Sequence, residues 1–98
     1  MDRPRVEIHP AAIAEARSAR EWYEERNPEA AKAFAAELDL AVAQIAGSPL
    51  RWPEYLHGTR QYLFRRFPYV AVYRETADVV KIVAIAHARR KPGYWRHR

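Results

Sequence analysis

The stretch Glu25-Arg-Asn-Pro-Glu29 joins two helical patterns and sets the arrangement of the first half of the chain. Asn27 is suited to capping a helix, Pro28 fits the first helical position, and Glu29 places an acid in the first turn. A second helix therefore begins almost where the first one ends. Because the connection is so short, the two helices are expected to lie antiparallel as a hairpin.

Apolar residues recur at helical spacing on both sides of this stretch, which predicts that each helix buries one face. In the first helix, over residues 10–25, they are Ile13, Ala16, Ala19, Trp22 and Tyr23. In the second helix they are Phe34, Leu38, Ala41, Val42 and Ile45. The second helix is expected to stop at Gly47-Ser48-Pro49.

Four segments outside the helices carry strand patterns, namely residues 5–9, 60–66, 67–74 and 78–87. The last two are separated by a tight hairpin turn at 75–77. The order β-α-α-β-β-β predicts an α+β fold, a small antiparallel sheet packed on an antiparallel helical hairpin, and one domain over residues 1–98.

The last strand has two faces of different character. Val80, Ile82, Ala84 and Ala86 alternate with Lys81, Val83, Ile85 and His87. The lysine marks the second set as the more open face. His87 is therefore expected to point away from the core beneath the helices, onto the face or rim from which the C-terminal tail departs.

The charge of the chain is sorted along its length. Residues 1–50 hold six basic and nine acidic side chains, and residues 51–98 hold eleven and three, so the halves carry −3 and +8 and sum to +5. The last twelve residues alone hold five Lys or Arg and no acid. This favours a basic face for nucleic acid, nucleotide-handling machinery or an acidic protein, with an ordinary solvated basic surface as the alternative.

Composition also excludes several classes of protein. The absence of cysteine excludes disulfides, thiolate metal sites and cysteine nucleophiles, and the spacing of the histidines does not resemble a metal site. We therefore expect no metal and no cofactor. The N-terminus has no apolar leader and no apolar run is long enough to span a bilayer, so we expect a cytoplasmic protein with no membrane partner.

One set of residues resembles a known family. Arg60, the run Arg65-Arg66-Phe67-Pro68-Tyr69, the pair Tyr73-Arg74 and the segment from His87 to Trp95 together resemble the RelE/ParE superfamily of bacterial type II toxins. The tail is most similar to ParE-like plasmid stabilisation proteins. The resemblance implies a growth-arresting toxin that is neutralised by a cognate antitoxin, here expected to supply an acidic and partly disordered segment.

The superfamily implies two different targets within one fold. RelE-like members are ribosome-dependent endonucleases that cut messenger RNA, and this reading carries roles onto five residues. Arg60 and Arg65 would clamp phosphate, His87 would be the acid or base, Arg90 would stabilise charge, and Tyr94 would orient the nucleotide. Only in this case would the chain be an enzyme.

ParE-like members inhibit DNA gyrase without catalysis, and we favour this target for two reasons. Lysines that RelE-like nucleases carry before the sheet hairpin have no evident counterpart here, and Pro92-Gly93 interrupts the C-terminal region. Target-binding residues would then be Arg66, Arg89, Lys91, Trp95 and Arg96.

Three alternatives stay open at this point. In the first, the chain is a plain basic nucleic-acid-binding module without catalysis. In the second, His87 is a strand-end histidine bonded to a neighbouring backbone group. In the third, Tyr94 and Trp95 fold back over the sheet.

Overall fold

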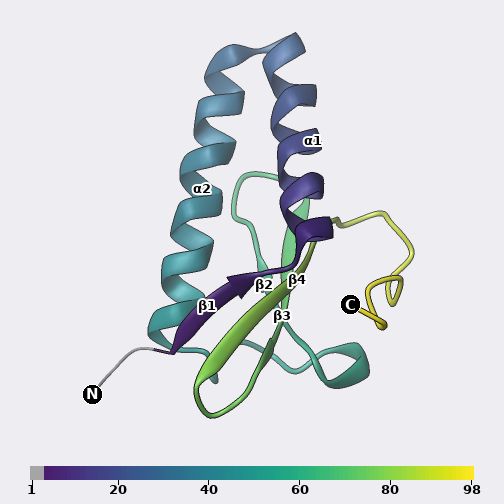
Figure 1. The fold of residues 1–98 in the computed structure, drawn as a ribbon. Helices are drawn as coiled ribbons and strands as arrows, with labels where there is room; N and C mark the ends of the chain where they lie inside the picture. Colours follow the sequence, from purple (N-terminus) through teal and green to yellow (C-terminus); the bar gives the residue numbers. More distant parts are fainter. Residues whose placement is uncertain (1–3) are drawn as a thin grey trace.

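The computed structural model describes residues 4–98, and the order and type of its elements confirm the expected α+β fold (Figure 1). In chain order the elements are β1 (Arg5–Ile8), α1 (Pro10–Arg26), α2 (Pro28–Gly47), the 3-10 turn η1 (Leu56–Gly58), β2 (Arg60–Leu63), β3 (Tyr69–Glu75) and β4 (Val79–His87). Residues 1–3, on which part of the expectation of no signal peptide rests, lie outside the described residues. Within residues 4–98, no helix is long and apolar enough to cross a membrane.

Asn27 is the hinge of the helical hairpin and serves both helices. Its backbone N–H donates to the Tyr23 carbonyl at the end of α1, at 2.6 Å. Its side-chain oxygen accepts from the N–H groups of Glu29 (3.1 Å) and Ala30 (3.4 Å) at the start of α2. One residue thus satisfies groups at two helix ends, and the helices run antiparallel beside each other (Figure 1).

The sheet has the strand order β1-β4-β3-β2. β2 pairs with β3 and β3 with β4 in the expected antiparallel sense, but β1 pairs with β4 in parallel, so the sheet is mixed. The parallel pair is possible because the helical hairpin and two strands lie between them in the chain, which leaves ample length for a crossover. β2 and β3 are also shorter than expected, since residues 64–68 form a loop in which Pro68 has no N–H to donate.

One face of the sheet packs against the helices through aromatic side chains. Phe34 of α2 is fully buried, and its ring centroid lies 5.2–5.7 Å from those of Tyr23, Phe64, Phe67 and Tyr69. Full burial of a ring such as that of Phe34 contributes roughly 1.5–3 kcal/mol. The helical stripe and the sheet are therefore held together near one end of β3.

The other face of the sheet is covered by the C-terminal segment. Trp95 is 1% exposed and packs with Val70, Val72, Val83 and Ala86. In Figure 1 the segment leaves the end of β4 and turns back beside the sheet. The structure thus shows Trp95 folded back over the sheet, which is one of the alternatives left open by the sequence.

A bulge in β4 changes which residues share a face. β3 and β4 pair in one register from Tyr69↔His87 to Val72↔Ala84, and then Tyr73 pairs with Ile82, which leaves Val83 as an extra residue. Val83 and Ala84 consequently both lie on the face beneath the C-terminal segment. The expectation that His87 points away from the helices is therefore wrong, because the bulge returns Ile85 and His87 to the helix side.

Candidate functional site

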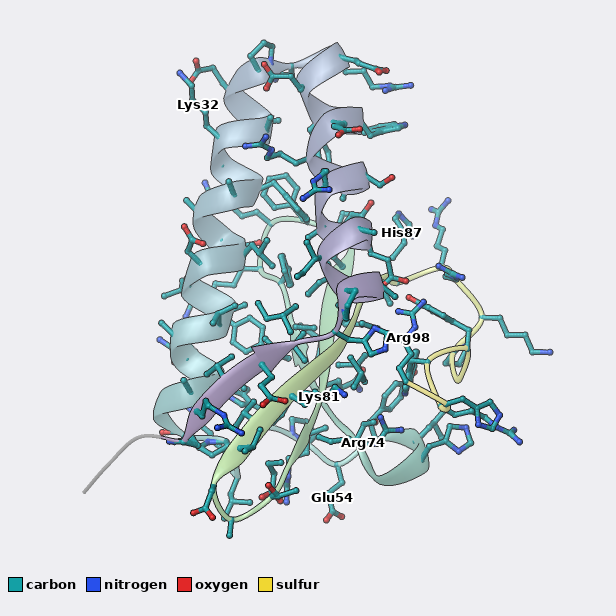
Figure 2. All side chains as sticks on the ribbon, viewed as in Figure 1. Lys32, Glu54, Arg74, Lys81, His87 and Arg98 are labelled. Carbon is teal, nitrogen blue, oxygen red and sulfur yellow. The ribbon has the colours of Figure 1, made fainter. Side chains whose placement is uncertain are left out.

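The C-terminal segment is fixed to the sheet by arginine side chains. Arg74 of β3 donates to the backbone carbonyls of Arg98 (3.0 Å) and Arg96 (3.2 Å). Gly93 adopts φ 95°, and a Cβ atom there would lie 3.2 Å from Nε2 of His57. Figure 2 shows Arg74 and Arg98 between the strands and this segment. The basic tail is therefore an ordered part of the fold.

Glu15 of α1 is the centre of a polar network that sequence reasoning did not single out. Its carboxylate accepts from Arg98 (2.9 Å), from the Ile85 N–H (3.0 Å) and from Arg90 (3.3 Å). Its side chain is only 15% exposed. Glu15 lies three residues after Ala12 and four before Ala19, and the structure buries both alanines, which places the carboxylate on the inner face of α1.

The network replaces a missing strand at the edge of β4. β1 ends at Ile8, opposite Ile82, so the following residues of β4 have no strand on that side. Glu15 accepts the Ile85 N–H, and Arg98 donates to the Val83 carbonyl at 3.1 Å. Side chains thus satisfy backbone groups that would otherwise form an open sheet edge.

Tyr94 lies within this network. The guanidinium of Arg90 stands 3.5 Å from its ring centroid, and that of Arg98 stands 5.0 Å away. Its hydroxyl is buried without a hydrogen bond of good geometry within the described chain. Burial, with the nearby Glu15 carboxylate adding to it, raises the pKa of Tyr94 to about 12, although both arginines oppose the shift. The phenol therefore stays protonated at neutral pH.

His87 ends β4 beside α1 (Figure 2). Its Nδ1 atom accepts from the backbone N–H of Arg89 at 3.1 Å, which assigns the proton of the neutral ring to Nε2. Its ring meets that of Tyr69 edge to face at a centroid distance of 5.1 Å. This geometry agrees with the alternative of a strand-end histidine bonded to neighbouring backbone.

The structure does not bring Arg60 to His87. Arg60 donates to the carbonyl of Trp52 at 2.8 Å and lies 3.7 Å from Glu54, so it holds the loop before β2. It pairs with Tyr73, whereas His87 pairs with Tyr69, four residues along β3. That separation alone is roughly 13 Å along the strand.

The other expected cations gather on two loops at one end of the sheet. Arg65 and Arg66 lie in loop 64–68, and Arg89, Arg90 and Lys91 follow β4; all five residues are exposed. The Ala88 N–H donates to the Pro68 carbonyl at 2.7 Å, which joins the two loops. Arg66 approaches the buried Glu37 carboxylate at 3.8 Å. We refer to residues 64–68 and 88–91 together as the basic loops.

The two remaining expected target-binding residues are placed differently. Arg96 is exposed on the C-terminal segment. Trp95, in contrast, is 1% exposed, and its indole stacks on Tyr55 at a centroid distance of 5.6 Å. The expectation that Trp95 contacts a target directly does not fit this conformation, because the apolar face of the sheet buries the ring.

An open groove of about 710 Å³ runs between α1 and the adjoining ends of β3 and β4. We call it the α1–β4 groove. Ser18 and Trp22 line it on the helix, and Tyr69, His87 and Arg90 line it on the sheet side. Trp22 is 52% exposed, although its position in the apolar stripe predicts a core residue. Within residues 4–98, no three His, Asp or Glu side chains gather as a metal ion would require.

The fold and its basic end define a small α+β protein, and comparison with known proteins gives the family. The chain matches the family model described as the ParE toxin of the type II toxin-antitoxin system parDE over residues 6–92. It therefore belongs to that family of toxins. No curated protein sequence matches it significantly.

Solved structures that share the fold include two toxin-antitoxin systems. The first is described as the chromosomal ParDE toxin-antitoxin system from P. aeruginosa, with 18% identity, a TM-score of 0.70 and coverage of 88% of this chain and 97% of that one. The second is the toxin-antitoxin complex RelBE2 from Mycobacterium tuberculosis, with 22% identity, a TM-score of 0.60 and coverage of 88% and 99%. At such identities the similarity concerns the fold.

Proposed function

We propose that this toxin arrests growth by binding and inhibiting DNA gyrase, that it is not an enzyme, and that a cognate antitoxin with an acidic segment neutralises it in the cytoplasm. The proposal rests on one observation: several of the residues that a nuclease would need for catalysis make contacts that hold the fold together. Arg60 holds a loop, Arg90 binds Glu15, and the Tyr94 hydroxyl is buried.

Cleavage of RNA through its own 2′-hydroxyl needs a base, a cation for the phosphate and an acid for the leaving group in one place. Of the five residues that the nuclease reading requires, His87 and Arg90 line the same groove. Arg60 lies roughly 13 Å along the strand from His87 and faces loop carbonyls. Arg65, the other residue expected to clamp phosphate, lies on the basic loops, so the two arginines do not act together at His87, which favours a binding function.

A gyrase inhibitor needs only a surface of suitable shape and charge. The basic loops offer five cationic side chains on adjoining segments, and the α1–β4 groove beside them exposes Trp22. Arginine and tryptophan are frequent among the residues that dominate binding energy at interfaces. Membership of the ParE family supports the same target.

The test compares two reactions with the purified chain. Inhibition of the supercoiling of relaxed plasmid by reconstituted gyrase, with no cleavage of messenger RNA in a purified translation system, is the expected result. Pulse labelling after controlled induction should show early loss of thymidine incorporation while methionine still enters protein. Early loss of methionine incorporation with intact supercoiling would contradict the proposal.

RelE-like cleavage of messenger RNA on the ribosome is the second candidate, because His87 and Arg90 line one groove beside the basic loops. It predicts that His87→Ala and Tyr94→Ala each abolish toxicity while antitoxin affinity is largely kept. The gyrase proposal predicts instead that Tyr94→Phe, which keeps the ring beneath Arg90, leaves growth arrest intact.

A further inference from the structure

The α1–β4 groove has an apolar floor and opens next to the basic loops. Of the cations of these loops, Arg90 lines the groove itself, where it pairs with Glu15. Ala14 and Ser18 leave space above α1, and Trp22 stands at one side with half of its surface exposed. The opposite wall is formed by Tyr69 and His87, at the ends of β3 and β4. A volume of about 710 Å³ lies within the roughly 300–1,000 Å³ that is typical of binding clefts.

The basic loops beside the groove keep unpaired charge. Arg66 approaches Glu37 and Arg90 binds Glu15, so those two cations are partly neutralised. Arg65, Arg89 and Lys91 form no ion pair within the described chain. The groove therefore opens beside a concentration of positive charge that attracts carboxylates.

Resting on the proposed function, we propose that the α1–β4 groove receives an acidic segment of gyrase in which a large apolar side chain lies next to carboxylates. The apolar side chain would fill the space above Ala14 and Ser18. Its neighbouring carboxylates would meet Arg89 and Lys91. A buried apolar anchor surrounded by complementary charge is a combination that gives both affinity and orientation.

The rings at the groove favour a protein segment over single-stranded nucleic acid. Nucleic acid binding of this kind relies on open aromatic faces for base stacking. The Arg26 guanidinium lies 3.9 Å from the centroid of the Trp22 ring and covers one face. Tyr69 is held between Phe34 and His87, with centroid distances of 5.2 and 5.1 Å. One face of Trp22 and two sides of Tyr69 are therefore already in contact with other side chains, which leaves little ring surface for base stacking.

Ala14→Trp tests occupancy of the groove, and Ala36→Trp is its matched control on an exposed position of α2. The measurement is the concentration of purified chain that halves supercoiling by gyrase reconstituted from its two subunits. We expect Ala14→Trp to raise this concentration at least about tenfold, because the new indole fills the space of the anchor. Ala36→Trp should match the wild type. Equal inhibition by both variants would overturn the proposal.

A second pair tests the charge of the occupant and does not depend on the folding of Ala14→Trp. Ser18→Glu and Ser18→Lys place side chains of similar size and opposite charge at one exposed position. An acidic occupant should be repelled by Ser18→Glu, with inhibition weakened at least about fivefold relative to Ser18→Lys. Equal values, or a reversed order, would exclude an acidic segment. Circular dichroism confirms that each variant is folded.

Growth arrest on induction separates this inference from the proposed function. If the wild type arrests growth without inhibiting gyrase, the gyrase proposal and the occupant named here both fail. If the wild type inhibits gyrase and the groove variants do so equally, only the groove assignment fails. Binding of a labelled single-stranded RNA oligonucleotide that Ala14→Trp abolishes would replace the protein segment with nucleic acid.

Discussion

At the level of single residues, Glu15 links parts of the chain that are far apart in sequence. It joins α1 to the edge of β4 and to the C-terminal segment through Ile85, Arg90 and Arg98. Apolar periodicity alone does not identify such a residue, because a carboxylate within a buried stripe is understood only once its partners are known. Their positions, 70 to 83 residues later, depend on tertiary structure.

We predict that Glu15→Ala lowers the free energy of unfolding by about 2–4 kcal/mol, since it leaves the Ile85 N–H and the Arg98 guanidinium without their partner. Urea denaturation measures the loss. Glu21→Ala, an exposed acid on the same helix, should change stability by less than about 0.5 kcal/mol. A similar effect of both substitutions would show that Glu15 has no special role.

Tyr73 and Tyr94 give the fold a dependence on alkaline pH. Burial is the main cause that raises the pKa of each to about 12, above the ordinary value of 10.0. Below pH 10 both phenols are protonated in the folded and unfolded chain, so their contribution is constant. Between about pH 10 and 12 the unfolded chain loses these protons first, and stability falls. The free energy of unfolding, measured by denaturation at several pH values in this range, should fall less steeply with pH in Tyr94→Phe than in the wild type. An equally steep fall in both would contradict the burial of this phenol.

At the level of elements, the two helices and their hairpin are predictable because the signals are local. Asn27 and Pro28 specify the connection from within five residues of sequence. The last strand shows the limit of such reasoning. Its bulge at Val83 arises from pairing with β3 and moves His87 to the helix side. The alternation of apolar residues within β4 does not predict this extra residue. The sequence reading therefore placed His87 at the right end of the strand and on the wrong face.

The C-terminal segment depends on one glycine, and a second glycine supplies the matched control. Gly93→Ala would place a methyl group 3.2 Å from His57 at φ 95°, so we expect a loss of about 1 kcal/mol or more and faster tryptic cleavage of the tail. Gly47→Ala, at the end of α2, meets nothing within 4 Å and should be neutral or slightly stabilising. Equal melting temperatures for the two variants would contradict the tight turn at Gly93.

At the level of the whole molecule, the basic half of the chain contains two groups of cations. One group makes contacts that hold the fold together, and the other stays exposed. Arg60, Arg74 and Arg98 hold loops and the C-terminal segment in place. The basic loops keep exposed cations at the end of the sheet where β3 begins and β4 ends. Residue counts predict a basic half, and only the fold shows which of its cations are committed to structure.

The exposed cations of the basic loops predict how target binding responds to salt. If Arg65, Arg89 and Lys91 attract an acidic partner, the affinity for immobilised gyrase should fall several-fold as ionic strength rises from about 0.05 to 0.2 M, since exposed charges are screened over this range. A variant with Arg89→Gln and Lys91→Gln should bind more weakly at low salt and lose less affinity as salt is added. Arg5→Gln, on β1 and paired with Glu7 at 3.1 Å, is the control and should keep the wild-type slope. Affinity that is independent of salt, or an equal slope in all three proteins, would show that the exposed cations of the basic loops take no part in recognition.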